Sequence, residues 1–508
     1  MPAQGAIPLT YINPVIPGFH PDPTICRVGR DYYLATSSFS YFPGVPVFHS
    51  RDLVHWRLLG HALTRRSQLD LTGADCSGGI WAPTLRCHGG RFYLVTTNMS
   101  HGGNFFVTAE DPAGEWSDPL WVDEGGFDPS LFFDDDGAVY YTRREGDTIV
   151  QAEIDPATGK LLAGPRVIAR GLCSPDIEGP HLYKIGGLYY LLAAEGGSRF
   201  GHSETVQRGT SPWGPFTPCP HNPILTHRHL SGCHIRATGH GDLVATPDGR
   251  WWMVFHATRH SYYDALSHLG RETFLAPVTW TEDGWPVVNG GQPIATAMEG
   301  DLPPPHPWPA EPAREDFDRG VPPSWVHLRN PRPANYSLTA RPGWLRLHGS
   351  PAALNDLDSP AFLGRRQEHL NCRAAARLDF QPAAEGEEAG LTVYLDRRHH
   401  YEAALIGRAG ERRLIVRRTV DDLAAETACV PVEQGPVTLA VETDPHTYRF
   451  AYCPDGGEPR SLAEGQAKLL GTELASSWTG VMLGLYATGN GRPSSAPADF
   501  DWFEYEGR

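Results

Sequence analysis

Short segments in which apolar and polar residues alternate recur along the whole chain, separated by glycine, proline and aspartate. Alternation with period two predicts β-strands, and the separating residues predict tight turns. In one recurring pattern, a small or acidic residue and usually a proline precede an apolar strand, a turn, and two adjacent aromatic residues. The copies are "DPTICRVGRDYYL", "APTLRCHGGRFYL", "DPSLFFDDDGAVYYT", "GPHLYKIGGLYYL" and "GDLVATPDGRWWMV". The chain is therefore predicted to contain repeated β-hairpins.

The spacing of these hairpins predicts the architecture. The intervals between the first aromatic residues of successive copies are 60, 48, 49 and 62 residues, counted over Tyr32, Phe92, Tyr140, Tyr189 and Trp251. A hairpin repeated roughly every 50 residues, followed by further alternating segments, is typical of a propeller with about four strands per blade. Residues 1–300 are accordingly predicted to form a five-bladed β-propeller in an all-β protein.

The strand pattern stops at residues 301–314, which begin "DLPPPHPWPAEPA". Proline lacks the backbone donor that a sheet needs, so this stretch is predicted to be a stiff linker laid over the surface. Strand-like segments such as "WLRLHG", "GLTVYLD" and "VTLAVET" resume in residues 315–508. They predict a second domain, a β-sandwich.

Composition supports this division and excludes several partners. A chain of 508 residues with 40% hydrophobic residues exceeds one typical core and can bury two. The formal net charge of −16 disfavours nucleic acid and anionic membranes as partners. No segment is typical of a membrane span or a signal peptide. Nine cysteines without C-x-x-C spacing indicate buried thiols in a reducing compartment, so a cytoplasmic location is expected.

Three acidic residues stand where the predicted blades begin. Aligned on the aromatic pairs, Asp22, Asp128 and Glu178 fall within two positions of the same point, with Trp81 and His240 near it in the other two blades. A lone Asp-Pro is ordinary turn chemistry, and the prolines on both sides of Asp22 predict a stiff, extended entry to its strand. Strand starts around a propeller axis converge, however, and carboxylates gathered there repel one another. Their convergence therefore favours a catalytic role.

Glycoside hydrolysis requires this set of groups. One carboxylic acid protonates the leaving oxygen while a second, ionised carboxylate activates water or attacks the sugar. The two need different pKa values, and mutual repulsion with a third acid separates such values. Sugars also present apolar faces that stack on aromatic rings, which are abundant in this chain.

The motifs "GFHPDP", "SGGIWAPTLR", "GFDPSLFFDDDG", "EGPHLYK", "TGHGDLV" and "LGRETFLAPVTWTEDGWPVV" resemble glycoside hydrolase family 43, especially its two-domain β-xylosidases and α-L-arabinofuranosidases. The resemblance runs in order over essentially the whole chain. It implies that Asp22 is the general base, that Glu178 is the general acid, and that Asp128 tunes the pKa of Glu178 and orients it. It also implies inversion of anomeric configuration, and a concanavalin-like sandwich packed on the propeller.

The same resemblance suggests further pocket residues, each with a structural alternative. Arg271 matches an arginine that contacts sugar hydroxyls, or forms a structural ion pair. Phe39 and Trp81 match aromatic walls of the terminal sugar subsite, or belong to the core. Trp478 is the candidate by which the sandwich closes the pocket, although a core tryptophan fits equally well. His240 contacts a buried water or a Ca²⁺ ion, as in some relatives, or is a structural histidine.

No cofactor is predicted to be required, and metal signals are weak. A structural Ca²⁺ near His240, or in the sandwich near Asp316 and Asp501, is the one metal considered. The segment "DDDG" is predicted to be a hairpin turn rather than a cation loop. A zinc site is disfavoured because no recognised ligand spacing occurs in the cluster of His227, His229, Cys233 and His234.

The sequence therefore predicts an exo-acting, inverting glycoside hydrolase. Its expected substrates are xylo-oligosaccharides with terminal β-D-xylose, arabinoxylan fragments with terminal α-L-arabinofuranose, or both, and the sequence does not rank the two sugars. An endo-arabinanase-like hydrolase and a non-catalytic carbohydrate-binding protein stay open as alternatives. Members of the family are often oligomeric, so a homo-oligomer is compatible with the resemblance.

Overall fold

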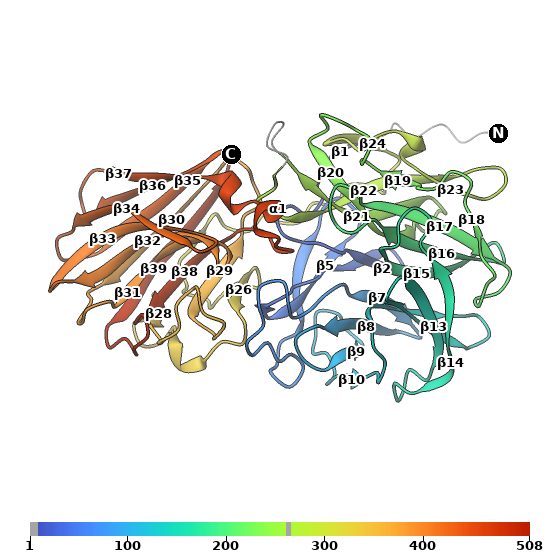
Figure 1. Ribbon diagram of the computed structural model, residues 1–508, viewed down its shortest axis with the longest axis horizontal. Helices are drawn as coiled ribbons and strands as arrows, with labels where there is room; N and C mark the ends of the chain where they lie inside the picture. Colours follow the sequence, from blue (N-terminus) through green and yellow to red (C-terminus); the bar gives the residue numbers. More distant parts are fainter. Residues whose placement is uncertain (1–8, 261–265) are drawn as a thin grey trace.

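The computed structural model describes residues 9–260 and 266–508. Antiparallel strands make up almost all of its regular structure, and they form two lobes that lie side by side (Figure 1). The first lobe, coloured blue to yellow-green, is a propeller, and the second, yellow to red, is a sandwich of two sheets. The described chain contains no helix with the length and apolar character needed to cross a lipid bilayer.

Five antiparallel sheets form the blades. The first contains β2 (Thr24–Val28), β3 (Asp31–Ala35), β5 (Gly44–Ser50) and β6 (Arg57–Leu63). The second contains β7 (Thr84–His88), β8 (Arg91–Asn98), β9 (Gly103–Ala109) and β10 (Leu120–Trp121). The third contains β11 (Phe127–Phe133), β12 (Val139–Glu145), β13 (Thr148–Ile154) and β14 (Leu161–Arg170). The fourth contains β15 (Ile177–Ile185), β16 (Leu188–Glu195), β17 (Ser203–Gly209), β18 (Thr217–Pro218) and β19 (Leu225–Thr226). The fifth contains β20 (Ile235–Ala245), β21 (Trp251–Arg259), β22 (Arg271–Trp280) and β23 (Pro286–Val288).

The hairpin pattern of the sequence reappears in these blades. Each predicted aromatic pair lies in the second strand of its sheet, namely β3, β8, β12, β16 or β21. The first strands contact one another in a closed ring, from β2 through β7, β11 and β15 to β20 and back to β2. An outer pair, β1 (Leu9–Ile12) with β24 (Ala297–Gly300), joins the two ends of the propeller sequence. The predicted five-bladed propeller is confirmed.

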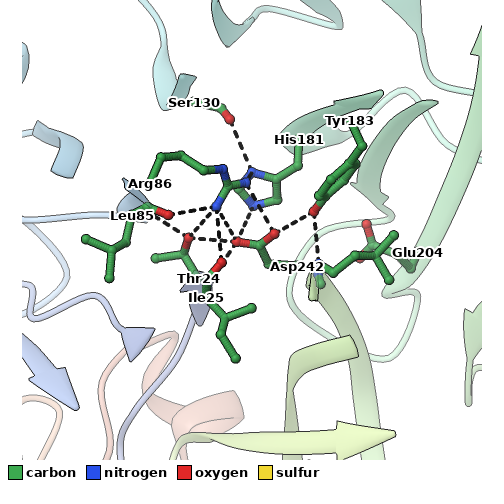
Figure 2. Close-up of polar contacts among 11 residues, drawn as sticks. Thr24, Ile25, Leu85, Arg86, Ser130, His181, Tyr183, Glu204 and Asp242 are labelled. Atoms are coloured by element: carbon green, nitrogen blue, oxygen red, sulfur yellow. Dashed lines mark hydrogen bonds and ion pairs between the residues drawn. The ribbon is translucent and has the colours of Figure 1, made fainter. Parts of the chain in front are cut away.

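A buried carboxylate, Asp242 of β20, ties the first strands together at the centre of the ring (Figure 2). Its Oδ2 accepts hydrogen bonds from the Thr24 hydroxyl at 2.7 Å and from the backbone N–H of Ile25 at 2.9 Å. Arg86 of the second blade donates to the same oxygen at 2.8 Å, and the Tyr183 hydroxyl of the fourth blade donates to Oδ1 at 2.5 Å. One side chain thus binds three other blades.

The third blade joins this hub through a histidine. Nδ1 of His181 lies 3.0 Å from Nη2 of Arg86 and 3.2 Å from the hydroxyl of Ser130 in β11. Burial lowers the pKa of His181 to about 3, so its neutral ring accepts these bonds. Burial opposes ionisation of Asp242 too, but the Arg86 guanidinium holds the pKa of that carboxyl well below its usual range. The hub is therefore a paired charge with satisfied hydrogen bonds.

The second lobe consists of two packed sheets. The outer sheet contains β25 (Arg314–Glu315), β27 (Tyr336–Ser337), β28 (Leu345–His348), β30 (Cys372–Phe380), β35 (Val437–Thr443), β36 (Thr447–Pro454), β37 (Arg460–Gln466) and β39 (Pro497–Gly507). The inner sheet contains β4 (Tyr41–Phe42), β26 (Trp325–Leu328), β29 (Ala361–Arg366), β31 (Glu388–Asp396), β32 (His399–Arg408), β33 (Glu411–Val420), β34 (Leu423–Pro431) and β38 (Met482–Thr488). Apolar side chains from both sheets form one continuous core, as the alternating pattern predicted. The short helices are η1 (Asn289–Gly291), η2 (Pro333–Asn335), η3 (Ala467–Leu470) and α1 (Thr472–Ala475).

The lobes share a sheet and a buried apolar cluster. Strand β4 lies in the sequence of the first blade, yet it pairs with β26 at the edge of the inner sandwich sheet. The proline-rich residues 301–313 contain no strand and pass the first blade, where the Trp308 ring lies 4.0 Å from Cζ of Arg57. The two lobes are therefore joined by hydrogen bonds as well as by packing.

Replacing Asp242 with asparagine is expected to lower the free energy of unfolding by about 3–5 kcal/mol, because it leaves the buried Arg86 charge unpaired. Urea unfolding followed by circular dichroism measures the change. Asp248→Asn is the matched control: Asp248 also pairs with an arginine, Arg250, but on the surface, and its loss should cost about 1 kcal/mol or less. Equal stability of the two variants would contradict the role given to the hub.

Candidate active site

A pocket of about 280 Å³ lies where the first strands of the blades begin. All eight residues predicted to be catalytic or substrate-binding line it: Asp22, Phe39, Trp81, Asp128, Glu178, His240, Arg271 and Trp478. Sequence reasoning did not name the other lining residues: Ala82, Phe127, Arg144, Asp176, Gly197 and Ser198. The propeller thus brings together acids that are more than 150 residues apart in the sequence, since Asp22 and Glu178 face one cavity.

Local backbone bends present the polar groups to this pocket. Asp22, Asp128 and His240 all have left-handed backbones, with φ of 54°, 53° and 54°. The expectation that the prolines hold Asp22 in an extended entry is therefore wrong; the chain turns sharply before β2 begins. Residues other than glycine adopt this conformation at a cost of about 1–3 kcal/mol, which is typical of functional sites.

Register shifts accompany these bends. In β11 the pairing with β12 slips between Phe127 and Ser130, and in β15 the pairing with β16 slips between Glu178 and His181. Such bulges re-aim side chains at the ends of strands. The residue after Glu178 is Gly179, with φ of 56°, and a Cβ there would lie 2.8 Å from Nε2 of His240. Only glycine fits beside the acid.

Asp22 is surrounded by groups that favour its ionised form. Its Oδ1 accepts a hydrogen bond from Nη1 of Arg271 at 2.5 Å, and its Oδ2 accepts one from the Ser37 hydroxyl at 2.5 Å. Nδ1 of His256 lies 3.0 Å from Oδ1. Burial raises the pKa of Asp22, but the Arg271 charge and the His256 contact outweigh it and hold that pKa well below its usual range. Asp22 is therefore a carboxylate, as a base requires.

The surroundings of Glu178 and Asp128 favour the protonated form of these acids instead. Burial raises the pKa of Glu178, and the charge of Asp22 adds to this, although His240 and Arg144 oppose it. Nη1 of Arg144 donates to Oε2 of Glu178 at 2.9 Å. Burial, with Glu178 and Asp22 nearby, also raises the pKa of Asp128. Its Oδ2 accepts a hydrogen bond from the backbone N–H of Gly179 at 3.0 Å. The two acids titrate as a pair that retains a proton above the ordinary pKa of a carboxyl group.

Aromatic side chains form the apolar walls. The ring of Trp81 lies 6.5 Å from that of Phe39 and meets the edge of Phe127 at 5.0 Å. Trp478 comes from the sandwich, in the segment after α1, and its backbone N–H donates to the Ser77 hydroxyl at 3.1 Å. Arg271 donates to the Trp478 carbonyl at 3.3 Å. One arginine thus contacts both the base and the wall supplied by the second lobe.

The residues around His240 do not suit Ca²⁺. Asp22, His240 and His256 each offer a ligand atom within 4.8 Å of the others. Ca²⁺ prefers about six to eight oxygen ligands, whereas this group supplies two imidazoles and one carboxylate. The guanidinium of Arg271 also bonds to the same carboxylate and repels a cation. These residues therefore do not fit a Ca²⁺ ion.

The other residues considered as metal ligands form ion pairs or hydrogen bonds within the protein. Asp316 pairs with Arg314 at 2.8 Å and Asp501 lies 3.7 Å from Arg377, so arginines occupy both carboxylates considered for Ca²⁺ in the sandwich. His227 uses both ring nitrogens, bonding to the Ile235 carbonyl and to a backbone N–H. The "DDDG" segment forms the turn between β11 and β12, as predicted.

Comparison with known proteins agrees with this geometry. The profile described as "Glycosyl hydrolases family 43" matches residues 11–286, and that described as "Beta xylosidase C-terminal Concanavalin A-like domain" matches residues 314–506. The chain is 44% identical to a non-reducing end alpha-L-arabinofuranosidase of Bacteroides ovatus, covering 98% of this chain and 94% of the relative. It is 40% identical to a xylosidase/arabinosidase of Butyrivibrio fibrisolvens, covering 97% and 99%. The chain belongs to glycosyl hydrolases family 43.

Solved structures extend the match to the whole family 43 architecture. The GH43B protein of a Bacteroides ovatus xyloglucan locus superposes with a TM-score of 0.95 at 43% identity, covering 98% of this chain and 100% of the other. The expected concanavalin-like second domain is confirmed by the profile match as well. The family assignment made from the sequence motifs is therefore correct.

Sequence analysis did not identify Arg144, which lines this family 43 pocket, or His256, which contacts Asp22. In the register of β11 and β12, Arg144 lies opposite Phe127, and its Cζ sits 4.9 Å over that ring. Counting back from the predicted turn at residues 134–137 would pair Phe127 with Glu145, and the register slip between Phe127 and Ser130 brings Arg144 opposite it instead. His256 had no sequence signal, because its contact with Asp22 depends on the left-handed backbone of Asp22.

Replacing Arg144 with glutamine is expected to move the alkaline limb of the kcat/KM profile to higher pH. The Arg144 cation lowers the pKa of Glu178, so its removal raises that pKa and keeps the acid protonated as pH rises. A pH profile on an unactivated disaccharide measures the shift. Arg170→Gln removes an exposed pair with Asp147 and serves as the control, with no shift expected. Movement of the limb to lower pH would contradict the assignment.

Proposed function

We propose that this protein is an exo-acting, inverting glycoside hydrolase that removes terminal β-D-xylose, terminal α-L-arabinofuranose, or both, from short oligosaccharides. The observation that carries the proposal is the difference in protonation within one small pocket. Asp22 is held ionised by Arg271, while burial favours the protonated form of Glu178. One base and one acid facing a common aromatic-lined cavity are what single-displacement glycoside hydrolysis needs.

In the proposed mechanism Asp22 accepts a proton from water as that water attacks the anomeric carbon. Glu178 donates its proton to the leaving glycosidic oxygen in the same step. Asp128 and Glu178 share one retained proton, and when Glu178 holds it the ionised Asp128 favours keeping it there. An inverting reaction leaves room for the water between base and acid, which places their carboxyls roughly 6.5–9.5 Å apart.

Exo action is supported by the size and closure of the pocket. A volume of about 280 Å³ suits one sugar ring rather than a polymer chain, and Trp478 of the sandwich supplies one wall. The relatives named above are an alpha-L-arabinofuranosidase and a xylosidase/arabinosidase. Both terminal sugars present similar hydroxyl arrangements, so one pocket can accept either.

Three substrates separate this proposal from its alternatives. We expect hydrolysis of 4-nitrophenyl β-D-xyloside or α-L-arabinofuranoside and no depolymerisation of linear arabinan. Release of internal arabinan fragments would indicate an endo-arabinanase. Sugar binding without turnover of any of the three would indicate a carbohydrate-binding protein.

Asp22→Ala and Glu178→Ala are each expected to lower kcat on xylobiose by about 10²–10⁴-fold or more, since each removes a proton-transfer group. Leaving-group dependence distinguishes them. An activated aryl leaving group needs little protonation, so Glu178→Ala should keep relatively more activity on the 4-nitrophenyl glycoside than on xylobiose. Equal losses of Glu178→Ala on both substrates would contradict its role as the acid.

The first sugar released is expected to have inverted anomeric configuration, because water attacks from the face opposite the leaving group. Proton NMR during the first minutes of hydrolysis, before mutarotation, distinguishes the two anomers. A retained configuration would refute direct water activation by Asp22.

A further inference from the structure

Ser37 has a fixed place beside Asp22, the base of the proposed reaction. It follows β3, in which Ala35 pairs with Thr24 at the start of β2. That register carries residue 37 toward the turn before β2, where its backbone N–H donates to the Pro21 carbonyl at 3.1 Å. The Ser37 side chain is buried, and it does not line the catalytic pocket. The hairpin of the first blade therefore holds this hydroxyl against Asp22, out of reach of a bound sugar.

The two oxygens of the Asp22 carboxylate have different surroundings. Oδ1 contacts Nη1 of Arg271 at 2.5 Å, Nδ1 of His256 at 3.0 Å and Nδ1 of His240 at 3.8 Å. Among the described residues, the Ser37 hydroxyl, at 2.5 Å, is the only hydrogen-bond donor to Oδ2. A carboxylate oxygen has two lone pairs, so Oδ2 keeps one for the attacking water, whereas Oδ1 is crowded by three basic side chains.

Contacts at both oxygens fix the plane of this carboxylate. Without Ser37, Arg271 and His256 would hold only Oδ1, and the carboxyl group could pivot about that atom. A general base must lie within hydrogen-bond reach of the proton that it accepts, and a misplacement of about 1 Å can cost on the order of 10²-fold in rate. The neutral hydroxyl of Ser37 therefore supplies orientation without adding a second positive charge.

We propose that Ser37 is a positioning residue for the general base, which holds Oδ2 of Asp22 toward the water that attacks the anomeric carbon. This inference rests on the proposed function. A purely electrostatic role would have the opposite sign: a hydrogen bond to the ionised form makes a carboxylate less basic, so its removal alone would strengthen the base and raise kcat. A loss of rate when the hydroxyl is removed is therefore the mark of positioning.

Ser37→Ala is expected to lower kcat by about 10–10²-fold with little change in KM, because Ser37 does not contact the bound sugar. The loss should be equal on an unactivated disaccharide and on the 4-nitrophenyl glycoside, since both need the same activated water. Ser37→Thr keeps the hydroxyl and should recover most of the rate. An unchanged or raised kcat in Ser37→Ala, or a loss confined to the disaccharide, would overturn the proposal.

Ser38→Ala is the matched control. Ser38 is adjacent and also buried, but its hydroxyl accepts a hydrogen bond from the backbone N–H of Val45 at 3.0 Å and does not bond to Asp22. Each variant loses one buried hydroxyl, so both should lower Tm to a similar extent, whereas only Ser37→Ala should lose rate. Equal losses of kcat in the two variants would indicate a general structural effect and would also overturn the proposal.

Crystal structures of the unmodified protein and of Ser37→Ala measure the orientation without turnover. We expect the carboxyl plane of Asp22 to rotate in the variant while Oδ1 keeps its contact with Arg271. An unchanged plane would contradict the role given to Ser37. The proposed hydrolase activity is tested separately, by turnover of the 4-nitrophenyl glycosides by the unmodified protein, so the two proposals can fail independently.

Discussion

The closed ring of first strands depends on one buried carboxylate. Asp242 binds the first, second and fourth blades directly and reaches the third through Arg86 and His181. Isolated buried charges are costly, but this one has a guanidinium partner and hydrogen-bond donors at both oxygens. Because the strands are fixed at this point, their starting residues converge on one pocket. The catalytic pocket is the space left by that convergence.

Within that space, the arrangement of arginines separates two kinds of carboxyl. Arg271 bonds directly to Asp22 and, with His256, outweighs the effect of burial. Arg144 bonds to Glu178 as well, yet burial and the other acids dominate there. The same desolvation thus acts on both groups, and the difference in protonation comes from the number and closeness of their partners. His256, whose pKa burial lowers to about 3, is neutral and contacts Asp22 without adding charge.

Much of this could be predicted from sequence because it is local. Each hairpin contains its own turn and aromatic pair, so the blades and the three convergent acids followed from spacing alone. The left-handed backbone of Asp22 could not be predicted, because proline ordinarily disfavours it and only the finished ring stabilises it. The placement of Trp478 depends on how the two lobes pack, and the pattern of apolar and polar residues does not predict that packing. The sequence alone therefore leaves its role open between pocket wall and core.

The burial of Arg366 is likewise a property of the assembled protein. An arginine at the end of an alternating strand is usually exposed, and this one, in β29 of the second lobe, becomes buried only when the first lobe covers it and the Phe19 carbonyl accepts a hydrogen bond from its Nε.

Strand β4 limits where the protein can be truncated. It belongs by sequence to the first blade and by hydrogen bonding to the sandwich, where it pairs with β26. A truncation after the propeller would strip this strand of its partner and expose an unpaired edge together with the apolar cluster beneath it. Recombinant propeller alone should therefore be prone to self-association, and a domain exchange with relatives that cuts at the linker must keep the β4 and β26 sequences compatible.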